Sequence, residues 1–430
     1  MREQPRTLLA ALIQQSDRTL EEWARVLAAA DDGAAISARH LGRLARAERG
    51  GAGQHPATRR ALTAVFGHSV DRLLSPWPPP IGPADGAGAA PPDGGGRSTL
   101  TMAAERARRF ALLTADAGTA GAVLDQLHDD VHRLTLAYPQ QPVGALLPDL
   151  TETQDTLFTL LERRQAPGPA RRLHFLAAVV SGLLAKASHD LAEPHAAMLQ
   201  ARTAVLCADL ADHDGLRAWL RGLQSLVAYW AGRYADAVRY AEAGAALADR
   251  AGGTAAVWLP VSAARAHAAL GDAGRALAAI RRADDGWSRV RPDDVDALGG
   301  ICTFTRARML YYAADALAWL PAEAATAGRY AEAAVAAYAD PRDPAWAFGD
   351  RAGSHTDLAI ARIAGRDLDG AGDALRPVLD LPAAQRINGV RHSVRRVQRA
   401  LVHAGLAGAG TGLVEEIDAF TAAPVPGVPG

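Results

Sequence analysis

The chain has 430 residues, about half of them hydrophobic, and a formal net charge of -1, so it can bury a sizeable core in two or three domains. Its two cysteines, Cys207 and Cys302, have no paired spacing, which argues against a disulfide scaffold and a cysteine-rich metal site. No apolar run approaches the ~18 residues of a membrane span, and the first residues lack the apolar core of a signal peptide. We therefore expect a cytoplasmic protein.

The basic surplus lies at the N-terminus. Residues 1–80 hold 11 Arg against 8 Asp or Glu, whereas the rest hold 35 Lys or Arg against 39 Asp or Glu. The first segment therefore carries +3 and the remainder -4, a distribution that favours nucleic-acid contact near the N-terminus. Lys186 is the only lysine, so part of the arginine abundance reflects a composition typical of high-GC genomes.

The stretch from Thr19 to Gly50 predicts two short helices. Thr19 is a good N-cap for the first helix, and Glu22 stands three residues later, where it completes a capping box. Ser37 is the expected N-cap of the second helix. Ile36 and Leu41 occupy the two positions of a hydrophobic staple around it.

The second helix, as written in the sequence, has two contrasting sides. The residues expected on its buried side are Ala38, Leu41, Leu44 and Ala45. On the opposite side, Arg39, Arg43 and Arg46 fall within an arc of about 60°. A helix of this kind suits the DNA major groove, because its apolar side fixes the pose while guanidiniums reach guanine edges or phosphates. A solvated basic face is the alternative interpretation.

Residues 5–75 resemble the lambda-repressor-like (Xre-type) helix-turn-helix domain. The resemblance rests on the T-x-E-E-x-A-x-x-L run from Thr19 to Leu27, the helix that begins at Ser37, and its E-x-G ending at Glu48 and Gly50. Two further short helices are expected at 57–66 and 70–74, which gives a five-helix bundle within residues 1–75.

The resemblance implies double-stranded DNA as a partner. The implied contact residues are Ser37, Arg39, His40, Arg43, Arg46, Arg49, Arg59 and Arg60. Among them, we expect Arg39 and Arg43 to read bases and the other arginines to hold phosphates. Such regulators usually bind an inverted-repeat operator as homodimers, because one recognition helix buries too little surface.

Residues 76–97 form the first boundary. Between Pro76 and Gly96 there are 7 Pro and 6 Gly, a composition that predicts a mobile linker. From 98 to 420 the pattern is helical throughout, with many Ala- and Leu-rich segments separated by Gly, Pro or Asp. Residues 421–430 are expected to form a flexible tail.

Repeats are visible within the helical segment. WAGRYADAVRY at Trp230, AGRYAEAAVAAY at Ala327 and AGRDLDGAGDAL at Ala364 share an Ala-Gly-Arg turn before an Ala-bearing helix. Units of this kind bury their apolar face only by stacking.

These units resemble tetratricopeptide repeats from about Leu173 to Leu406. The matching positions are Gly232 with Tyr234 and Ala237, Gly271 with Ala273 and Ala276, and Gly328 with Tyr330 and Ala333, where Pro321 offers a competing turn. The expected fold is therefore all-α, with an N-terminal helix-turn-helix bundle and a C-terminal tetratricopeptide-like α-solenoid.

The resemblance places the first helix of each pair on the inner face of the solenoid. This nominates six effector-binding residues, Trp219, Tyr229, Trp258, Arg265, Arg306 and Arg362. Arginines with aromatics suit a short peptide or a small anionic molecule, although Trp219 and Trp258 could equally be core residues. Asn388 is the only asparagine, which weakens the case for a peptide held by asparagines.

Catalytic patterns are sparse. His128, Asp129, Asp130 and His132, with His189 and Asp190 further on, could form a metal phosphohydrolase site, but 13 histidines in a chain of this length give such pairs by chance. No nucleotide-binding or nucleophile-elbow motif is present. We expect no enzymatic activity, cofactor or metal.

The sequence favours a DNA-binding transcriptional regulator whose repeats mediate dimerisation and possible effector binding. Two alternatives remain open. One is a protein-interaction scaffold with a degenerate helix-turn-helix domain, favoured by Leu20, where the family often has Gln, and by the long acidic turn with Asp31 and Asp32. The other is an enzyme regulated through its repeats, for which the histidine and aspartate pairs are the support.

Overall fold

The computed structural model describes residues 6–14, 18–30, 36–46, 55–66, 70–75 and 120–422. These residues are helical with connecting turns and contain no β-strand, which confirms the all-α fold class. They fall into two compact units, one before residue 100 and one after it. None of the described helices is both long and apolar enough to cross a membrane.

The N-terminal unit contains five short helices. They are α1 (Leu8–Gln14), α2 (Leu20–Ala30), α3 (Ala38–Ala45), α4 (Pro56–Phe66) and α5 (Val70–Leu73). Each of the five contributes leucine or alanine side chains to one core, in which Leu9, Leu27, Leu41, Leu62 and Leu73 are fully buried. The expected short helices near 57–66 and 70–74 are therefore present.

One helix boundary differs from the sequence prediction, and several predicted segments lie partly or wholly outside the described residues. The acidic turn between the two predicted helices is expected to begin at Ala28. Helix α2 instead continues to Ala30, so the first residues of that turn are helical. Alanine is the strongest helix former, and the run Ala28–Ala30 simply extends the helix. The predicted linker at 76–97 lies outside the described residues. Of the predicted tail, residues 421 and 422 end the last helix, and 423–430 lie outside the described residues.

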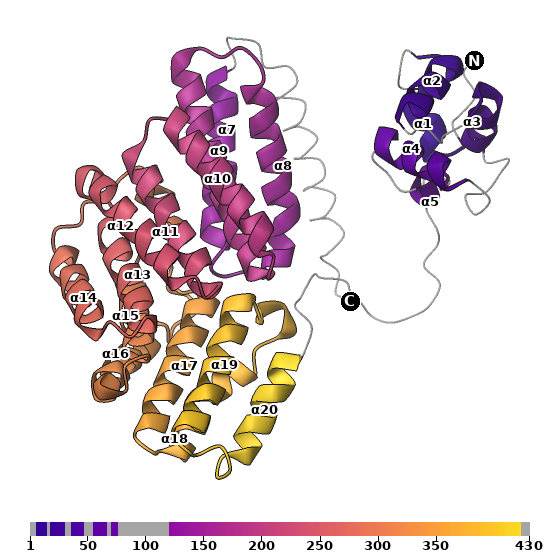
Figure 1. The fold of residues 1–430 in the computed structure, drawn as a ribbon. Coiled ribbons are helices and arrows are strands. Elements are labelled where there is room, and N and C mark those ends of the chain that lie inside the picture. The colour runs from indigo at the N-terminus through magenta and orange to yellow at the C-terminus, as the bar shows by residue number, and fades with distance from the viewer. Residues whose placement is uncertain are drawn as a thin grey trace. The chain divides into compact units, whose positions relative to one another are not determined.

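The C-terminal unit is built from consecutive helices that pack in neighbouring pairs (Figure 1). The helices are α7 (Ala120–Ala137), α8 (Val143–Leu161), α9 (Pro167–Asp190), α10 (Pro194–Leu210), α11 (Asp214–Trp230), α12 (Tyr234–Ala251), α13 (Ala255–Ala269), α14 (Ala273–Trp287), α15 (Arg306–Leu317), α16 (Ala324–Ala337), α17 (Phe348–Ala364), α18 (Leu368–Leu379), α19 (Asn388–His403) and α20 (Thr411–Ala422). Short 3₁₀ turns lie between α14 and α15, before α16 and before α19.

The turns within the pairs use the left-handed backbone region. Gly232 between α11 and α12 has φ 72°, and Gly271 between α13 and α14 has φ 82°, a conformation in which glycine carries no Cβ penalty. Between α17 and α18, Arg366 takes this conformation with φ 61°. The turns predicted at Gly232, Gly271 and Gly365 are therefore found.

The turn predicted at Gly328 is wrong, because Gly328 lies inside α16. The chain turns earlier, where Pro321 opens a 3₁₀ segment before the helix, as proline at a helix start favours. Consequently Ala333 is exposed, while Ala331 and Ala334 are buried. A Cβ on Gly328 would make an ordinary contact, 3.6 Å, with the Cβ of Ala361 on α17, so the packing there does not require a glycine.

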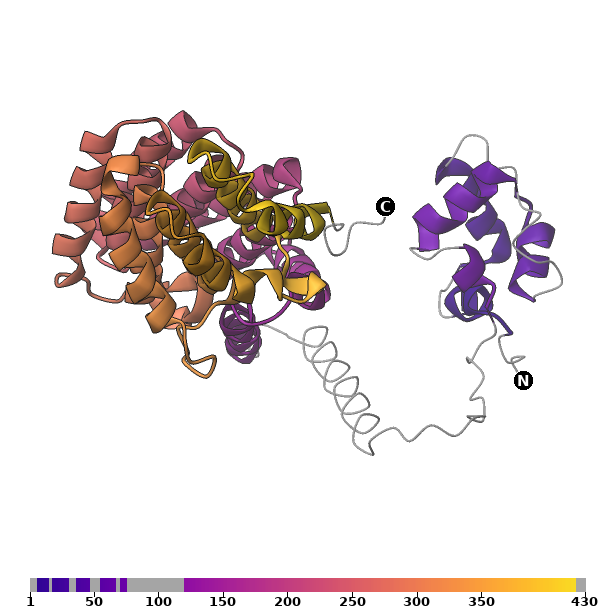
Figure 2. The ribbon, with the colours of Figure 1, turned by 90° about the horizontal axis from the view of Figure 1, so that it is seen from below.

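The last helices of this unit return to its earlier ones. Helix α19 contacts α9, and the 3₁₀ turn before α19 contacts α8. Figure 2 shows the yellow C-terminal helices beside the magenta ones. At the junction, the rings of Trp230 and His392 are 6.2 Å apart, and a Cβ on Gly389 would lie 3.7 Å from the Trp230 ring.

Replacing Gly222 tests the close packing of α11 against α13. A Cβ at Gly222 would lie 2.5 Å from the ring of the buried Trp258, so Gly222→Ala should lower the free energy of unfolding by about 1–3 kcal/mol through overpacking. Gly372→Ala is the matched control, because a Cβ there meets nothing within 4 Å, and it should stabilise α18 by up to about 1 kcal/mol.

Both variants are measured by denaturant unfolding of the full chain. Equal effects of the two substitutions would contradict the tight contact at Gly222.

Candidate functional site

Helices α2 and α3 begin with the caps expected from the sequence. The backbone N–H of Thr19 donates to the Glu22 carboxylate at 2.7 Å, and the N–H of Glu22 donates to the Thr19 hydroxyl at 3.2 Å. The side chain of Ser37 accepts from the N–H of His40 at 3.2 Å. These bonds satisfy N–H groups that the helices leave without internal partners, so both helix starts are fixed.

Helix α3 is held in the N-terminal unit along one side. Leu41 and Leu44 are fully buried and Ala45 nearly so, as its sequence pattern predicts, whereas Ala38 in the first turn is half-buried. The buried hydroxyl of Thr7 donates to the carbonyl of Ala45 at 2.6 Å, which ties the end of α3 to the residue preceding α1. The orientation of α3 in this unit is therefore well defined.

The arginines of α3 are not equivalent. Arg39 and Arg46 are exposed, whereas Arg43 is half-buried and its Nε has no hydrogen-bond partner in the described part of the chain. The guanidinium of Arg46 folds back over Gly42, where a Cβ would lie 3.5 Å from Nη1. The expected row of Arg39, Arg43 and Arg46 is therefore not uniformly exposed, because Arg43 is half-buried.

The other expected DNA contacts lie on α3, on α4 or just before α3. Ser37 is exposed and His40 is half-buried. On α4, Arg59 is half-buried and Arg60 is exposed. Arg49 lies outside the described residues. The described DNA-contact candidates in this unit therefore lie at the start of α3, along α3 and on α4.

The structure separates the six predicted effector residues into three groups. Trp219 and Trp258 are core residues that pack over Gly182 and Gly222 respectively, so they do not line a surface. Arg306 and Arg362 are exposed and pair with Asp284 and with Glu332 and Asp367. Tyr229 and Arg265 do come together.

Tyr229 and Arg265 belong to a buried charged cluster where several helices meet. Arg265 of α13 donates from Nε to the carboxylate of Asp315 on α15 at 2.5 Å. Arg396 of α19 donates to the other oxygen of the same carboxylate. The hydroxyl of Tyr229 on α11 donates to Asp315 at 2.8 Å and accepts from Trp319 at 2.8 Å. One carboxylate thus joins four helices.

A second carboxylate, Asp357 on α17, lies beside the cluster without joining its hydrogen bonds. It is 1% exposed, its Oδ1 is 3.7 Å from Nη1 of Arg396, and neither oxygen has a hydrogen-bond partner among the described residues. Burial, reinforced by the charge of Asp315, raises the pKa of Asp357 well above its usual value. The neutral form of Asp357 is therefore favoured.

Asp315 behaves in the opposite way. Burial alone would raise its pKa, but the charges of Arg265 and Arg396 outweigh burial and hold the pKa of Asp315 below its usual value. With Asp315 ionised and Asp357 neutral, two guanidiniums face one carboxylate. The cluster therefore keeps an excess of positive charge inside the unit.

Sequence reasoning missed Asp315, Asp357 and Arg396. Asp315 left a usable signal, because it is the single charge in the otherwise apolar segment YYAADALAW. Arg396 left none, since it stands between Arg395 and Arg399 in the same basic helix. Only the packing of α19 on α17, which brings Arg396 to Asp315 on α15, buries one of these arginines and leaves the other two exposed.

A cavity of about 570 Å³ opens beside the charged cluster, lined by residues of α9, α11, α12 and α19 and the turns next to them. Four aromatic side chains line it, namely Tyr229, Trp230, Tyr234 and Trp319. Basic side chains and imidazoles complete the lining, namely His189, His392, Arg396 and Arg399. Flat rings beside cations can hold a small organic anion.

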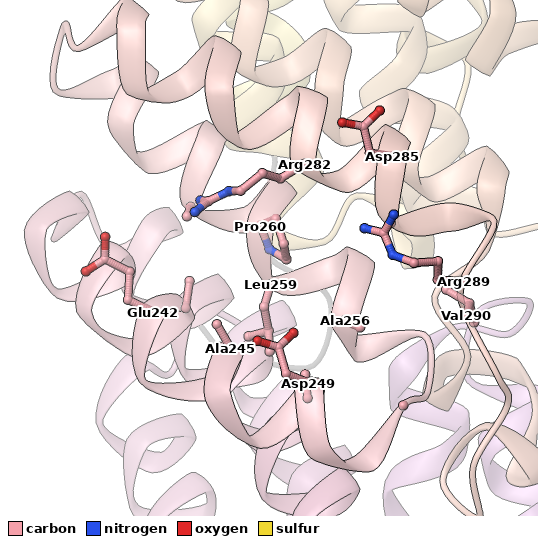
Figure 3. A pocket seen from close by; sticks show the side chains of 15 residues that line it. Glu242, Ala245, Asp249, Ala256, Leu259, Pro260, Arg282, Asp285, Arg289 and Val290 are labelled. Atoms are coloured by element: carbon pink, nitrogen blue, oxygen red, sulfur yellow. The ribbon is translucent and has the colours of Figure 1, made fainter.

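A separate cavity of about 540 Å³ lies between α12, α13 and α14 (Figure 3). Its floor includes Leu259 and Pro260 of α13, Asp249 comes from α12, Arg282 comes from α14, and Arg289 follows the end of α14. It contains none of the six predicted effector residues. A third cavity, of about 520 Å³ and mainly apolar, lies among α15, α16, α17 and α19.

The histidine and aspartate pairs, considered above as a metal site, lie on α7 and at the end of α9. The rings of His128 and His132 are 6.4 Å apart on α7, and no group of three or more potential ligands is arranged to hold a metal within the part of the chain that is described. The buried Asp190 accepts from Lys186 and from Tyr138. This carboxylate therefore links α9 to the end of α7.

Comparison of the chain with protein-family models and with curated proteins found no match.

Replacing Asp315 and Asp357 by asparagine should lower the free energy of unfolding by different amounts. Asp315→Asn removes the ionised carboxylate that the buried Arg265 and Arg396 share and should lower the free energy of unfolding by about 3–5 kcal/mol. Asp357→Asn replaces a carboxyl that is already neutral, so its effect should stay within about 1 kcal/mol. Denaturant unfolding of the full chain at neutral pH measures both, and similar losses would contradict the assigned charge states.

The raised pKa of Asp357 predicts that the free energy of unfolding depends on pH. The pKa of Asp357 is raised in the folded state, whereas an Asp in the unfolded chain has a pKa of about 4. Between these two pKa values the folded chain binds one proton more than the unfolded chain, so the free energy of unfolding falls as the pH rises from about 4 to the raised pKa. The unfolding free energy of the wild type relative to Asp357→Asn should therefore decrease from pH 4 toward the raised pKa. A difference that is constant with pH would show that Asp357 is ionised in the folded protein.

Proposed function

We propose that this chain is a DNA-binding transcriptional regulator, with an Xre-type helix-turn-helix domain in the N-terminal unit. The observation that carries the proposal is the way α3 is fixed in the N-terminal unit. Its start is capped by Ser37, its apolar side is buried through Leu41 and Leu44, and Arg39 is exposed. A basic helix held in a fixed pose is what major-groove reading requires.

The proposed roles of the basic residues in DNA binding depend on how exposed each side chain is. Arg39, exposed in the first turn of α3, reads bases, and Ser37 and His40 lie at the same end of the helix, where backbone N–H groups favour a phosphate. Arg46, Arg59 and Arg60 hold phosphates, as does Arg49. Arg43 remains part of the basic surface, but its half-burial assigns base reading chiefly to Arg39.

The C-terminal unit is proposed to be a tetratricopeptide-like solenoid that mediates homodimerisation and effector binding. Its support is the order of the helices, which pack pairwise along the chain, and the left-handed turns at Gly232 and Gly271. A homodimer would present two copies of α3 to an inverted-repeat operator. The protein would act in the cytoplasm, where operators are found.

One observation favours the second candidate function, a protein-interaction scaffold. Leu20, which stands where the resembling family often has Gln, packs against α3, since a Cβ on Gly42 would lie 3.3 Å from Leu20 Cδ1. A side chain used for packing does not brace a DNA contact. A scaffold of this kind would keep the helical bundle without selective binding to DNA.

Selection of bound sequences from a random DNA pool, with the full chain, separates the two functions. A regulator should enrich a two-fold symmetric motif, and its affinity for that motif should fall steeply with salt because phosphate contacts release counterions. Failure to enrich any motif at low salt would remove the proposed function and favour the scaffold.

Point variants test the proposed roles on the enriched motif. Arg39→Ala should cost about 1–3 kcal/mol of binding and relax sequence preference, whereas Arg59→Ala should weaken all sequences alike and lower the salt slope by about one. Arg342→Ala is the control, because Arg342 is an exposed arginine of the C-terminal unit paired with Asp340. Equal losses on operator and random DNA for both test variants would contradict the division of roles.

A further inference from the structure

We propose that the cavity beside the charged cluster binds a small organic anion built on a planar aromatic ring. The site is formed where α9 and α11 end, where α19 begins, and beside Trp319. The proposal gives a ligand class and a location to the effector binding proposed above. Binding itself needs no DNA, so it can be tested whether or not the N-terminal unit recognises an operator.

The walls of the cavity supply surfaces for an aromatic ring. Trp230 and Tyr234 are half-buried, and their rings pack edge-on against Tyr229 and Trp319 respectively, with centroids 5.1 Å and 5.7 Å apart. This packing fixes the four rings before any ligand enters. Rings held in place can stack on a planar ligand with little loss of side-chain entropy.

Uncompensated positive charge lies on the α19 side of the cavity. Arg399, which lines the cavity, has no carboxylate within ion-pair distance in the described residues, unlike Arg217, Arg250 and Arg376 on other helices, which pair with acids. His392, earlier on the same helix, also lines the cavity. Burial, followed by the charges of Arg395, Arg399 and Arg391, lowers the pKa of His392.

The backbone adds to this field. Three helices begin at the cavity, α10, α12 and α19, and none of their N-cap residues, Glu193, Arg233 and Ile387, makes a side-chain cap hydrogen bond. Uncapped helix starts leave N–H groups and a partial positive charge for an anion.

Together these features restrict the ligand class. A volume of about 570 Å³ suits a small molecule and is too small for a polymer. The arginines disfavour a cation, which the aromatic rings alone would accept. The rings in turn favour an aromatic anion over bare inorganic phosphate. The site therefore selects for a ring and a negative charge in one molecule.

The test uses anilinonaphthalene sulfonate, an aromatic anion whose fluorescence rises on binding, with the full chain and without DNA. Phenylnaphthylamine, which has the same rings and no charge, is the matched neutral probe. We expect saturable binding of the sulfonate at one site and at least about tenfold weaker binding of the neutral probe, since a charge-assisted contact contributes about 1.5–3 kcal/mol. Equal binding of the two probes would overturn the proposal.

Four variants locate the bound probe. Arg399→Gln and Tyr234→Ala remove a cation and a ring of the cavity and should each weaken binding about tenfold. Because Arg399 also lines the neighbouring cavity and Tyr234 does not, Tyr234→Ala is the variant that assigns the probe to this cavity. Arg395→Gln, which removes the same charge outside the cavity lining, and His403→Ala, which alters only the neighbouring apolar cavity, should each change it by less than about twofold.

The variants also give the outcomes that contradict the site. Wild-type affinity in Arg399→Gln would overturn the proposal, and because Arg399 is exposed, this variant should fold. Weaker binding in His403→Ala with no change in Tyr234→Ala would place the probe in the neighbouring cavity and equally overturn it. Failure to enrich an operator in the DNA selection would leave these measurements unaffected.

Discussion

The carboxylate of Asp315 is the interaction on which the C-terminal unit depends most. It accepts hydrogen bonds from Arg265, Arg396 and Tyr229, so side chains far apart in the sequence are fixed at one point inside the unit. A buried guanidinium without a counter-charge is costly, and two of them share this single acid. The positions of α13 and α19 are thereby coupled through α15.

Small residues make that arrangement possible. Gly222 and Gly353 leave room for the rings of Trp258 and Tyr311, which a Cβ would meet at 2.5 Å and 2.4 Å. Buried alanines such as Ala237 and Ala276 let the second helix of a pair approach the first. Because the helices lie this close, α19 reaches Trp230 at the end of α11. The cavity that results has aromatic rings on one side and basic residues on the other.

The arginines of the chain therefore serve different purposes in different surroundings. Arg265 and Arg396 are buried and bound to Asp315, while Arg306 and Arg362 are exposed and paired with acids. Surface pairs of the second kind contribute little to stability. Arg399 at the cavity and Arg39 on α3 lie where a ligand or DNA could reach them, which is why the two proposed binding functions rest on these residues rather than on the arginine count.

Local signals in the sequence determined the helical class, the caps at Thr19 and Ser37, the buried side of α3 and the turns at Gly232 and Gly271. These features depend on residues a few positions apart, whose hydrogen bonds and backbone preferences operate within one or two helical turns. The turn expected at Gly328 was wrong, and the competing local signal at Pro321, which the sequence also shows, marks the turn instead.

Tertiary structure alone decided which charges are buried. Sequence reasoning placed Tyr229 and Arg265 on an inner face but could not join them to Asp315, because that contact spans 86 residues for Tyr229 and 50 for Arg265. It could not distinguish Arg396 from Arg395 and Arg399, nor foresee that Arg43 is half-buried. Burial and the pKa of a group depend on which distant helices pack against it, and a linear pattern does not contain that information.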